Sequence, residues 1–370
     1  MSQLSLFEDT SVFSEVRTEG IKYTGSKLKL IPHILDCVSS LNGVSTILDG
    51  FSGTTRVSQA FAQRGYSVIS NDVAEWSEIF GNCYLLSKRE DEFYQGILNE
   101  LNQLEGYSGW FSEHYGAQEL NGVKRPFQLK NTEKLDAIRD RISTLGLNRT
   151  DESVVLTSLI RALDSVDSTI GHYVSYLSSW SPRSNNDLLL SLPKRVQGTG
   201  LHEVIKGDVF DVIDGRYFYL AYFDPPYGSN NEKMPPSRVR YAAYYHIWKT
   251  VINNDQPELF GRANRREDSR DTVACSIFEE FRKDDDDTFI ALKALGSLIR
   301  KTNARYILLS YSSGGRATKE ELASIINNEG KLLRIIELDY KKNVMGNMRW
   351  TDEWINSDKR NMEYLFLMEK

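Results

Sequence analysis

The sequence has few of the residues that build disulfide frameworks and zinc sites. Among its 370 residues are five scattered histidines and three cysteines, Cys37, Cys83 and Cys275, which lie far apart. Neither residue type occurs with the CxxC or HxxxH spacing that is typical of metal-binding motifs. We therefore expect a chain without disulfide bonds and without a metal ion.

Long apolar runs are also missing. No stretch approaches the roughly 18 consecutive apolar residues of a membrane span. The start, MSQLSLFEDTS, lacks the basic and apolar regions of a secretory signal, and no segment carries the heptads of a coiled coil. With an ordinary composition of 40% hydrophobic and 26% charged residues, the sequence predicts a soluble, cytoplasmic and monomeric protein.

An excess of positive charge is the third absence. The net charge of −6 argues against a protein that holds nucleic acid by bulk positive charge. Residues 81–199 contain 13 Lys and Arg against 15 Asp and Glu, whereas residues 232–270 contain eight against five. Any nucleic-acid site must therefore be a local basic patch on an acidic body.

The pattern of apolar residues predicts an α/β fold. STILDGFSGTTRVSQAFAQRG indicates a buried strand, a turn of small residues and a helix, and YSVISNDVAEW indicates a second strand. Two such units in a row predict a mainly parallel sheet with helices on both faces. Later strands are indicated by HEVIK, YLAYF, ARYILLSYSS, KLLRIIELDY and EYLFLMEK.

Helical patterns interrupt these strands between residues 77 and 199. We therefore predict a flexible arm over 1–20, an α/β domain formed by 21–76 and 200–370, and a mostly helical insert over 77–199. Within the insert, NTEKLDAIRDRISTL predicts an amphipathic helix capped by Asn131 or Thr132. KDDDDTFIALKALGSLIRKTN predicts a later helix with its acids in the first turn.

Acidic residues follow several of the predicted strands. Asp49, Asp72 and Asp224 stand at strand ends, and Asp208 lies just upstream in KGDVF. Each alone could be an ordinary helix cap. Together, at the carboxyl edge of one parallel sheet, they resemble a nucleoside cofactor site. Gly53 in FSGTT supports this interpretation, since glycine lets the backbone approach a ligand closely.

The stretch YLAYFDPPYGSN places one of these acids before two prolines. Proline cannot donate a hydrogen bond to a β-ladder, so the strand should stop at Asp224. The carboxylate is then left at the sheet edge where open α/β sheets bind ligands.

The order of KYTGSK, DGFSGT and DPPY resembles the Dam-type, alpha-ordered, S-adenosylmethionine-dependent DNA N6-adenine methyltransferases. The resemblance covers most of the chain. It implies a Rossmann-like class I methyltransferase domain, with the insert as a DNA target-recognition domain. The implied reaction is methyl transfer from S-adenosyl-L-methionine to the exocyclic amine of a flipped adenine in double-stranded DNA. The implied setting is restriction-modification, with a possible cognate endonuclease, or phage or host DNA modification.

The resemblance also assigns a cofactor site. Lys27 is expected near the carboxylate end of the cofactor, Asp72 at its ribose hydroxyls and Asp208 near its adenine. The family often has a second glycine where Thr55 stands, which leaves the geometry of that turn open. The complete set of expected contacts is Tyr23, Lys27, Asp49, Phe51, Gly53, Asp72, Asp208 and Asp224.

The implied catalytic residues are Asp224, Pro225, Pro226 and Tyr227. The lone pair of the adenine amine is conjugated into the ring, so this nitrogen is a poor nucleophile. If Asp224 and the Pro225 carbonyl accept its two N–H groups, the lone pair can localise and point at the methyl group. Tyr227 would offer a ring on which the flipped base stacks.

Several residues are candidates for DNA contacts. SRVRYAAYYHIWK interleaves arginines with aromatic rings, which suits DNA but equally suits a solvated helix with its aromatic residues in the core. GRANRRE predicts a mobile loop that DNA could order. The candidates are Lys124, Arg125, Arg183, Arg238, Arg240, Tyr244, Arg262, Arg265 and Arg266.

The segment QLSLF resembles the pentapeptide with which bacterial proteins bind the sliding clamp, with Gln3, Leu4, Leu6 and Phe7 as its contacts. Chance, or an arm that packs on its own body, is the alternative.

Two other functions stay open at this stage. One is a DNA-binding or regulatory module that has the same fold but no turnover, and the other is methylation of the cytosine amine, for which Ser-Pro-Pro-Tyr is more usual. Methylation of cytosine carbon needs a thiolate, commonly in a Pro-Cys motif, and this chain has none.

Overall fold

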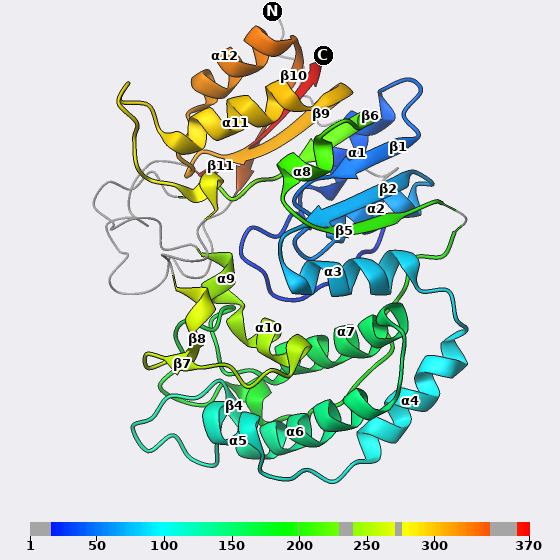
Figure 1. The fold of residues 1–370 in the computed structure, drawn as a ribbon, viewed down its shortest axis with the longest axis vertical. Helices are drawn as coiled ribbons and strands as arrows, with labels where there is room; N and C mark the ends of the chain where they lie inside the picture. Colours follow the sequence, from blue (N-terminus) through cyan, green and yellow to red (C-terminus); the bar gives the residue numbers. More distant parts are fainter. Residues whose placement is uncertain (1–15, 199, 229–239, 271–275, 341–360) are drawn as a thin grey trace, which may run out of the picture.

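The computed structural model describes residues 16–198, 200–228, 240–270, 276–340 and 361–370. Within these ranges, no helix is long and apolar enough to cross a membrane. Figure 1 shows two parts: a sheet covered by helices, and a second part built mainly of helices.

A seven-stranded sheet forms the centre of the first part. Its strands are β1 (Thr46–Asp49), β2 (Ser67–Asp72), β5 (Glu203–Lys206), β6 (Tyr217–Phe223), β9 (Asn303–Ser312), β10 (Lys331–Tyr340) and β11 (Asn361–Glu369). The strand order is β10-β11-β9-β6-β1-β2-β5. Among the described strands of this sheet, β11 runs opposite to the other six, because it pairs antiparallel with both β10 and β9. The predicted mixed, mainly parallel sheet is confirmed.

Helices cover both faces of this sheet. The alternation of side chains along a strand sends Ile47 and Leu308 to one face and Leu48 and Leu309 to the other. On the first face they pack with α1 (Ile31–Ser39) and α2 (Arg56–Gln63). On the second they pack with α8 (Val209–Ile213), α11 (Ile290–Lys301) and α12 (Lys319–Glu329).

The second part has its own apolar core. Its helices are α3 (Glu75–Gly81), α4 (Asp91–Gln103), α5 (Trp110–Tyr115), α6 (Leu129–Thr144), α7 (Arg149–Val166), α9 (Tyr241–Tyr244) and α10 (His246–Asn253). Although α10 follows the DPPY segment in sequence, it lies beside α7 (Figure 1). Arg139 of α6 donates to the carbonyls of Val251 and Ile252 at 2.7 and 2.9 Å. The helical core therefore includes a segment outside the predicted insert, whose boundaries at 77 and 199 stay a prediction.

Two predicted helix starts are wrong. Helix α6 begins at Leu129 after Gln128, so Asn131 and Thr132 lie inside the helix. The Asn131 side chain instead bonds the backbone at Asn186 and Leu188. Helix α11 begins at Ile290, so the acidic run lies before it, where Asp284 accepts the Thr288 N–H and closes a turn.

Gly50 is the point where β1 meets the strand that carries Asp224. A Cβ atom at this position would lie 2.7 Å from ring carbons of Phe223, which is closer than packed atoms tolerate. We predict that Gly50→Ala lowers the free energy of unfolding by about 1–3 kcal/mol, the usual cost of overpacking. The measurement is urea unfolding followed by circular dichroism.

Gly96 provides the matched control, since it is exposed in the interior of α4 with no atom within 4 Å of a new Cβ. Gly96→Ala should raise the free energy of unfolding by about 0.5–1 kcal/mol through helix propensity. Equal effects at the two positions would contradict the packing described here.

Candidate functional site: a pocket at the carboxyl edge of the sheet

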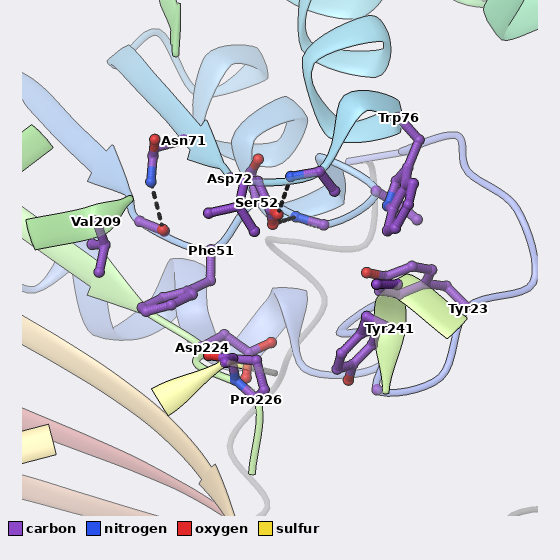
Figure 2. Close-up of a pocket in the computed structure, with 18 of the residues that line it drawn as sticks. Tyr23, Phe51, Ser52, Asn71, Asp72, Trp76, Val209, Asp224, Pro226 and Tyr241 are labelled. Atoms are coloured by element: carbon purple, nitrogen blue, oxygen red, sulfur yellow. Dashed lines mark hydrogen bonds between the residues drawn. The ribbon is translucent and has the colours of Figure 1, made fainter. Parts of the chain in front are cut away.

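A cavity of about 610 Å³ opens where β1, β2 and β6 end. In Figure 2, Asp224 and Pro226 lie across it from Asp72, and the rings of Tyr23 and Tyr241 form one side. All eight residues predicted to contact the cofactor line this cavity: Tyr23, Lys27, Asp49, Phe51, Gly53, Asp72, Asp208 and Asp224. Their roles stay predictions, but the structure brings them together from five separate segments.

The turn after β1 is fastened to the end of β2. Gly53 adopts a left-handed φ of 51° and donates its N–H to the Asp72 carboxylate at 2.9 Å, while Ala74 donates to the other oxygen at 3.0 Å. Burial raises the pKa of Asp72, although these N–H groups oppose the rise. A side chain at Gly53 would meet the Tyr23 ring at 3.3 Å. Glycine at residue 53 therefore allows both the left-handed backbone and the close approach of the turn to the Tyr23 ring.

Thr55 keeps the backbone conformation that glycine would favour. It has a φ of 59°, which β-branched residues rarely adopt, and its side chain is fully buried. Its hydroxyl donates to the Thr54 carbonyl at 2.7 Å. The departure from the family pattern at this position therefore changes the residue but retains a left-handed turn.

Asp49 is a buried acid with one unsatisfied oxygen. Its Oδ2 accepts from the Ser58 hydroxyl at 2.6 Å, whereas Oδ1 has no hydrogen-bond partner within the described ranges. Burial raises the pKa of Asp49 to about 7. The Oδ1 atom of Asn71 is likewise buried without a partner in the described part of the chain. Such acceptors in a cavity wall fit a polar ligand with N–H or O–H donors.

Aromatic rings from the helical part close one side of the cavity. Tyr23 stacks on Tyr245 and Tyr241 at centroid distances of 4.6 and 5.3 Å. Trp76 packs edge-on to Tyr245 at 5.8 Å and also lines the cavity. Sequence reasoning missed Trp76 and Tyr241 as pocket residues, because neither stands in a recognisable cofactor motif.

The DPPY segment forms the opposite end. Strand β6 stops at Phe223, as the prolines predict, and leaves the half-buried Asp224 carboxylate at the cavity edge. Its Oδ1 accepts a hydrogen bond from the Tyr227 hydroxyl and lies 3.2 Å from the Lys27 Nζ. Burial raises the pKa of Asp224 to about 6, against the opposing pull of Lys27.

Lys27 has three partners inside the protein. Its ammonium contacts Asp224, the Tyr227 hydroxyl and Glu363, while its contact with a cofactor carboxylate stays a prediction. Burial alone would lower the pKa of Lys27, but these carboxylates raise it. Glu363 is a residue that sequence reasoning missed. The start of an antiparallel strand lies at the same sheet edge as the carboxyl ends of the parallel strands. The position of Glu363 near the start of β11 was therefore the signal that could have identified it.

Tyr227 also has contacts inside the protein, and its stacking on a flipped base stays a prediction. Its ring is tilted against Tyr311 at a centroid distance of 4.7 Å and is not part of the cavity wall. Its hydroxyl points to Asp224 and Lys27 instead. Of the prolines, Pro226 lines the cavity and Pro225 is buried beneath it.

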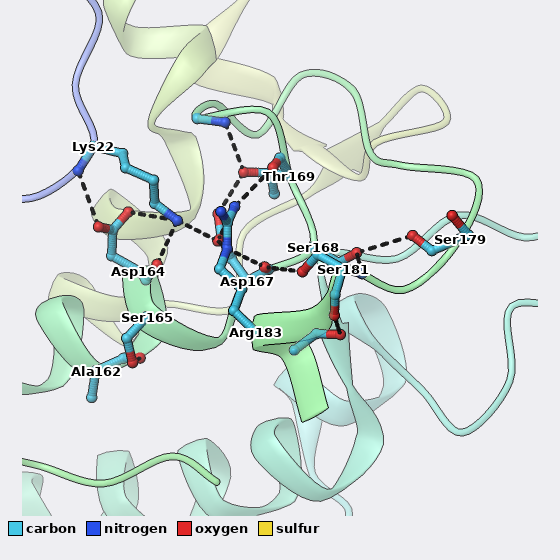
Figure 3. Close-up of polar contacts among 12 residues, drawn as sticks. Lys22, Ala162, Asp164, Ser165, Asp167, Ser168, Thr169, Ser179, Ser181 and Arg183 are labelled. Carbon is cyan, nitrogen blue, oxygen red and sulfur yellow. Dashed lines mark hydrogen bonds and ion pairs between the residues drawn. The ribbon is translucent and has the colours of Figure 1, made fainter. Parts of the chain in front are cut away.

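Arg183 is occupied within the protein (Figure 3). Its guanidinium donates to the Asp167 carboxylate at 2.7 Å and to the Thr169 carbonyl at 2.8 Å. Asp167 is only 1% exposed and also receives the Lys22 ammonium at 2.5 Å. The structure therefore gives Arg183 a buried acid as an internal partner, and its DNA contact stays a prediction.

Three further DNA candidates are buried. Arg240 is 5% exposed and lies 3.5 Å from Glu279. Arg266 is 4% exposed and forms two bonds to Asp255 at 2.6 and 2.8 Å. Tyr244 stacks on His172 at 4.4 Å. Internal partners hold each of these side chains, and their DNA contacts stay predictions.

The remaining candidates stay predictions. GRANRRE contains the turn and the second strand of a hairpin formed by β7 (Leu259–Phe260) and β8 (Arg265–Arg266), and its mobility stays a prediction. Lys124 and Arg262 are exposed, while Arg125 and Arg265 are half-buried. Several predicted positions lie outside the described residues: Gln3, Leu4, Leu6, Phe7, Arg238 and Cys275. The described ranges contain no cluster of three His, Cys, Asp or Glu that could hold a metal ion.

The mainly parallel sheet, with helices on both faces and a pocket at its carboxyl edge, is a Rossmann-like fold. The chain belongs to the D12 class N6 adenine-specific DNA methyltransferase family, which matches residues 23–321. The family description names adenine, and neither alternative from the sequence is favoured.

Three relatives share the same degree of sequence identity with this chain. The chain is 26% identical to the Type II methyltransferase M.FokI of Planomicrobium okeanokoites, over 87% of this chain and 49% of that protein. It is 26% identical to the modification methylase StsI of Streptococcus sanguinis, over 95% and 52%. The chain therefore spans about half the length of these two relatives. Against the Type II methyltransferase M.NlaIII of Neisseria lactamica, it is 26% identical over 95% and 99%.

One solved structure also resembles the chain. It is the rRNA methyltransferase aviRa of Streptomyces viridochromogenes, with 12% identity, 95% and 88% of the two chains covered, and a TM-score of 0.31. That score is too low to support a conclusion about fold or function.

The contacts of Arg183 predict a loss of stability when it is replaced. Arg183→Gln should lower the free energy of unfolding by about 2 kcal/mol, because Asp167 keeps its buried charge and loses a partner. The exposed Arg262→Gln should change it by no more than about 0.5 kcal/mol. Thermal and urea unfolding measure both. Unchanged stability with weakened DNA binding in Arg183→Gln would support the DNA-contact assignment.

Proposed function

We propose that this chain is a site-specific DNA adenine methyltransferase that uses S-adenosyl-L-methionine and acts on an adenine flipped out of double-stranded DNA. The observation that carries the proposal is the position of Asp224. This carboxylate ends β6 at the edge of the same cavity as the Gly53 turn and Asp72. One pocket would thus hold both the substrate amine, at Asp224, and the nucleoside part of the cofactor, at Gly53 and Asp72.

The residues of the cavity fit such a methyl donor. Asp72 would accept the ribose hydroxyls, and the Gly53 turn leaves room for close approach beside Tyr23. The partner-free Oδ1 of Asp49 could accept an ammonium or amide donor. Asp208 caps α8 through the Phe210 N–H and stays exposed at the cavity, where an adenine ring would lie. When bound, the cofactor supplies an electrophilic methyl group.

Asp224 would act on the adenine amine by accepting its hydrogen. Its Oδ1 is held by Tyr227 and Lys27, so we assign Oδ2 to the substrate. Together with the Pro225 carbonyl, that oxygen would withdraw the amine hydrogens from the ring plane and localise the nitrogen lone pair. The two prolines restrict the backbone, so both acceptors are in place before the base arrives. Once the nitrogen gains a methyl group, its surplus proton can pass to the Asp224 carboxylate.

The setting and partners extend this proposal. The names of M.FokI, StsI and M.NlaIII describe methyltransferases or modification methylases, so we propose a restriction-modification or DNA-modification role. The helical part would read the target sequence, with exposed Lys124 and Arg262 among the phosphate contacts. Clamp binding through residues 3–7 remains a separate proposal. Deleting residues 1–8 and measuring binding to the clamp tests it, and unchanged affinity rejects it.

The experiment that tests the proposed function is expression in a host without DNA methylation, followed by sequencing that detects modified bases. We expect N6-methyladenine at one short recurring sequence. Unmodified DNA from cells that contain folded, cofactor-binding protein would contradict the proposal, as would modified cytosine.

Replacing Asp224 should stop the reaction without unfolding the protein. Asp224→Asn is predicted to reduce methyl transfer by about a thousandfold or more, because the amide cannot accept hydrogen bonds as a carboxylate does. Cofactor affinity, measured by calorimetry, should stay within about threefold. Asp211→Asn, an exposed acid of α8, is the control and should retain full activity. Near-normal transfer by Asp224→Asn would exclude the assigned role.

The pH dependence of transfer should report the same group. The proposed hydrogen bond from the amine N–H requires the ionised carboxylate. Burial raises the pKa of Asp224 to about 6. The single-turnover rate should therefore fall as the pH is lowered through about 6. The folded state also holds this proton more tightly than the unfolded state does. Asp224 thus contributes more to stability as the pH falls from about 6 toward the ordinary aspartate range. A rate that stays constant down to pH values near the ordinary aspartate pKa would contradict the assignment.

A further inference from the structure

The ammonium of Lys27 is surrounded by three oxygen atoms. Its Nζ lies 2.5 Å from the Tyr227 hydroxyl, 3.2 Å from Asp224 Oδ1 and 3.2 Å from Glu363 Oε2. A lysine has three N–H donors, so these contacts can use all of them. Lys27 is 6% exposed and Glu363 7% exposed, which removes both from competing water.

Glu363 enters this group from the far end of the sequence. It lies near the start of β11, opposite Ser312 of β9, and the strand continues with apolar residues into the core. A buried carboxylate is costly unless it is paired. Its partners within the described residues are Lys27 and, at 3.5 Å, the Tyr227 hydroxyl. Glu363 thus contacts both groups that hold Asp224 but does not touch Asp224 itself.

The charges of this group do not balance. One ammonium faces two carboxylates, so Lys27 cannot neutralise Asp224 completely while it also pairs with Glu363. Other titratable groups also act on Asp224, and burial remains the largest influence on its pKa. The groups around Asp224 are Lys27, Glu363, Tyr227, Asp49, Tyr222 and Tyr241.

We propose that Glu363 is a positioning residue for methyl transfer: by sharing Lys27 with Asp224, it keeps the Asp224 carboxylate oriented and available to the substrate amine. Without Glu363, the ammonium would pair with Asp224 alone, and the carboxylate would be a weaker acceptor. The inference rests on the proposed function, because it explains how the same carboxylate stays reactive although a buried cation lies beside it.

The variant Glu363→Gln tests this directly, because glutamine keeps the size and one acceptor oxygen but removes the charge. We expect kcat for methyl transfer to fall by about tenfold, with KM values for DNA and cofactor within about threefold. The acid limb of the rate profile should move to lower pH, because removing a neighbouring negative charge lowers the pKa of Asp224. Glu369→Gln, at the other end of β11, is the control and should change neither quantity.

A second readout uses the protein without substrates. In protein labelled with ¹³C at aspartate carboxyl carbons, the Asp224 signal is identified by its loss in Asp224→Asn. Its titration midpoint should lie at lower pH in Glu363→Gln than in the unmodified chain. Glu363→Asp, whose carboxylate is withdrawn from Lys27 by one methylene, should shift the midpoint in the same direction by less. This variant keeps the test readable if Glu363→Gln does not fold.

The outcomes separate the two proposals. If the unmodified protein transfers no methyl group, the proposed function fails, while the carboxyl titration still reports whether Glu363 controls Asp224. If the protein is active, an unchanged acid limb, an unchanged Asp224 midpoint and an unchanged kcat in Glu363→Gln would overturn the inference. Lower thermal stability with those three quantities unchanged would show that Glu363 is only structural.

Discussion

The proposed reaction depends on a carboxylate that is largely shielded from water just after a strand, yet must remain charged to act. Moving Asp224 out of water disfavours its ionised form. Lys27 and the Tyr227 hydroxyl oppose this effect from within hydrogen-bonding distance. Glu363 in turn limits how completely Lys27 neutralises the acid. The balance among these four side chains sets the strength of the acceptor that the chemistry requires.

The fold assembles this group from distant parts of the chain. Lys27 precedes the first strand, Asp224 follows the central β6, and Glu363 lies near the start of the antiparallel β11. The helical part contributes as well, since Tyr23 stacks on Tyr245 beside α10. The neighbouring Lys22 is tied to Asp164 and Asp167 at the end of α7 (Figure 3). The segment that carries Lys27 is therefore anchored to both parts of the structure.

Much of this arrangement follows from local sequence, and the rest does not. The apolar runs before Asp49, Asp72 and Asp224 predicted parallel strands with acids at one edge, because a strand's period and a following proline are local properties. The internal partners of Arg240 and Arg266 were not predictable in this way. Whether an arginine faces DNA or an internal acid depends on Glu279 and Asp255, whose positions only the folded chain determines. Glu363 was missed for the same reason, since its partner Lys27 is 336 residues away in sequence.

The most direct test of the central claim is a crystal structure of the protein with its target duplex and an unreactive analogue of the methyl donor. The quantity to measure is the distance from the Asp224 carboxylate to the exocyclic nitrogen of the flipped adenine. We expect a hydrogen bond of about 2.7–3.2 Å, with Lys27 still shared between Asp224 and Glu363. An adenine amine held by other groups, with both oxygens of Asp224 turned away from the base, would contradict the account.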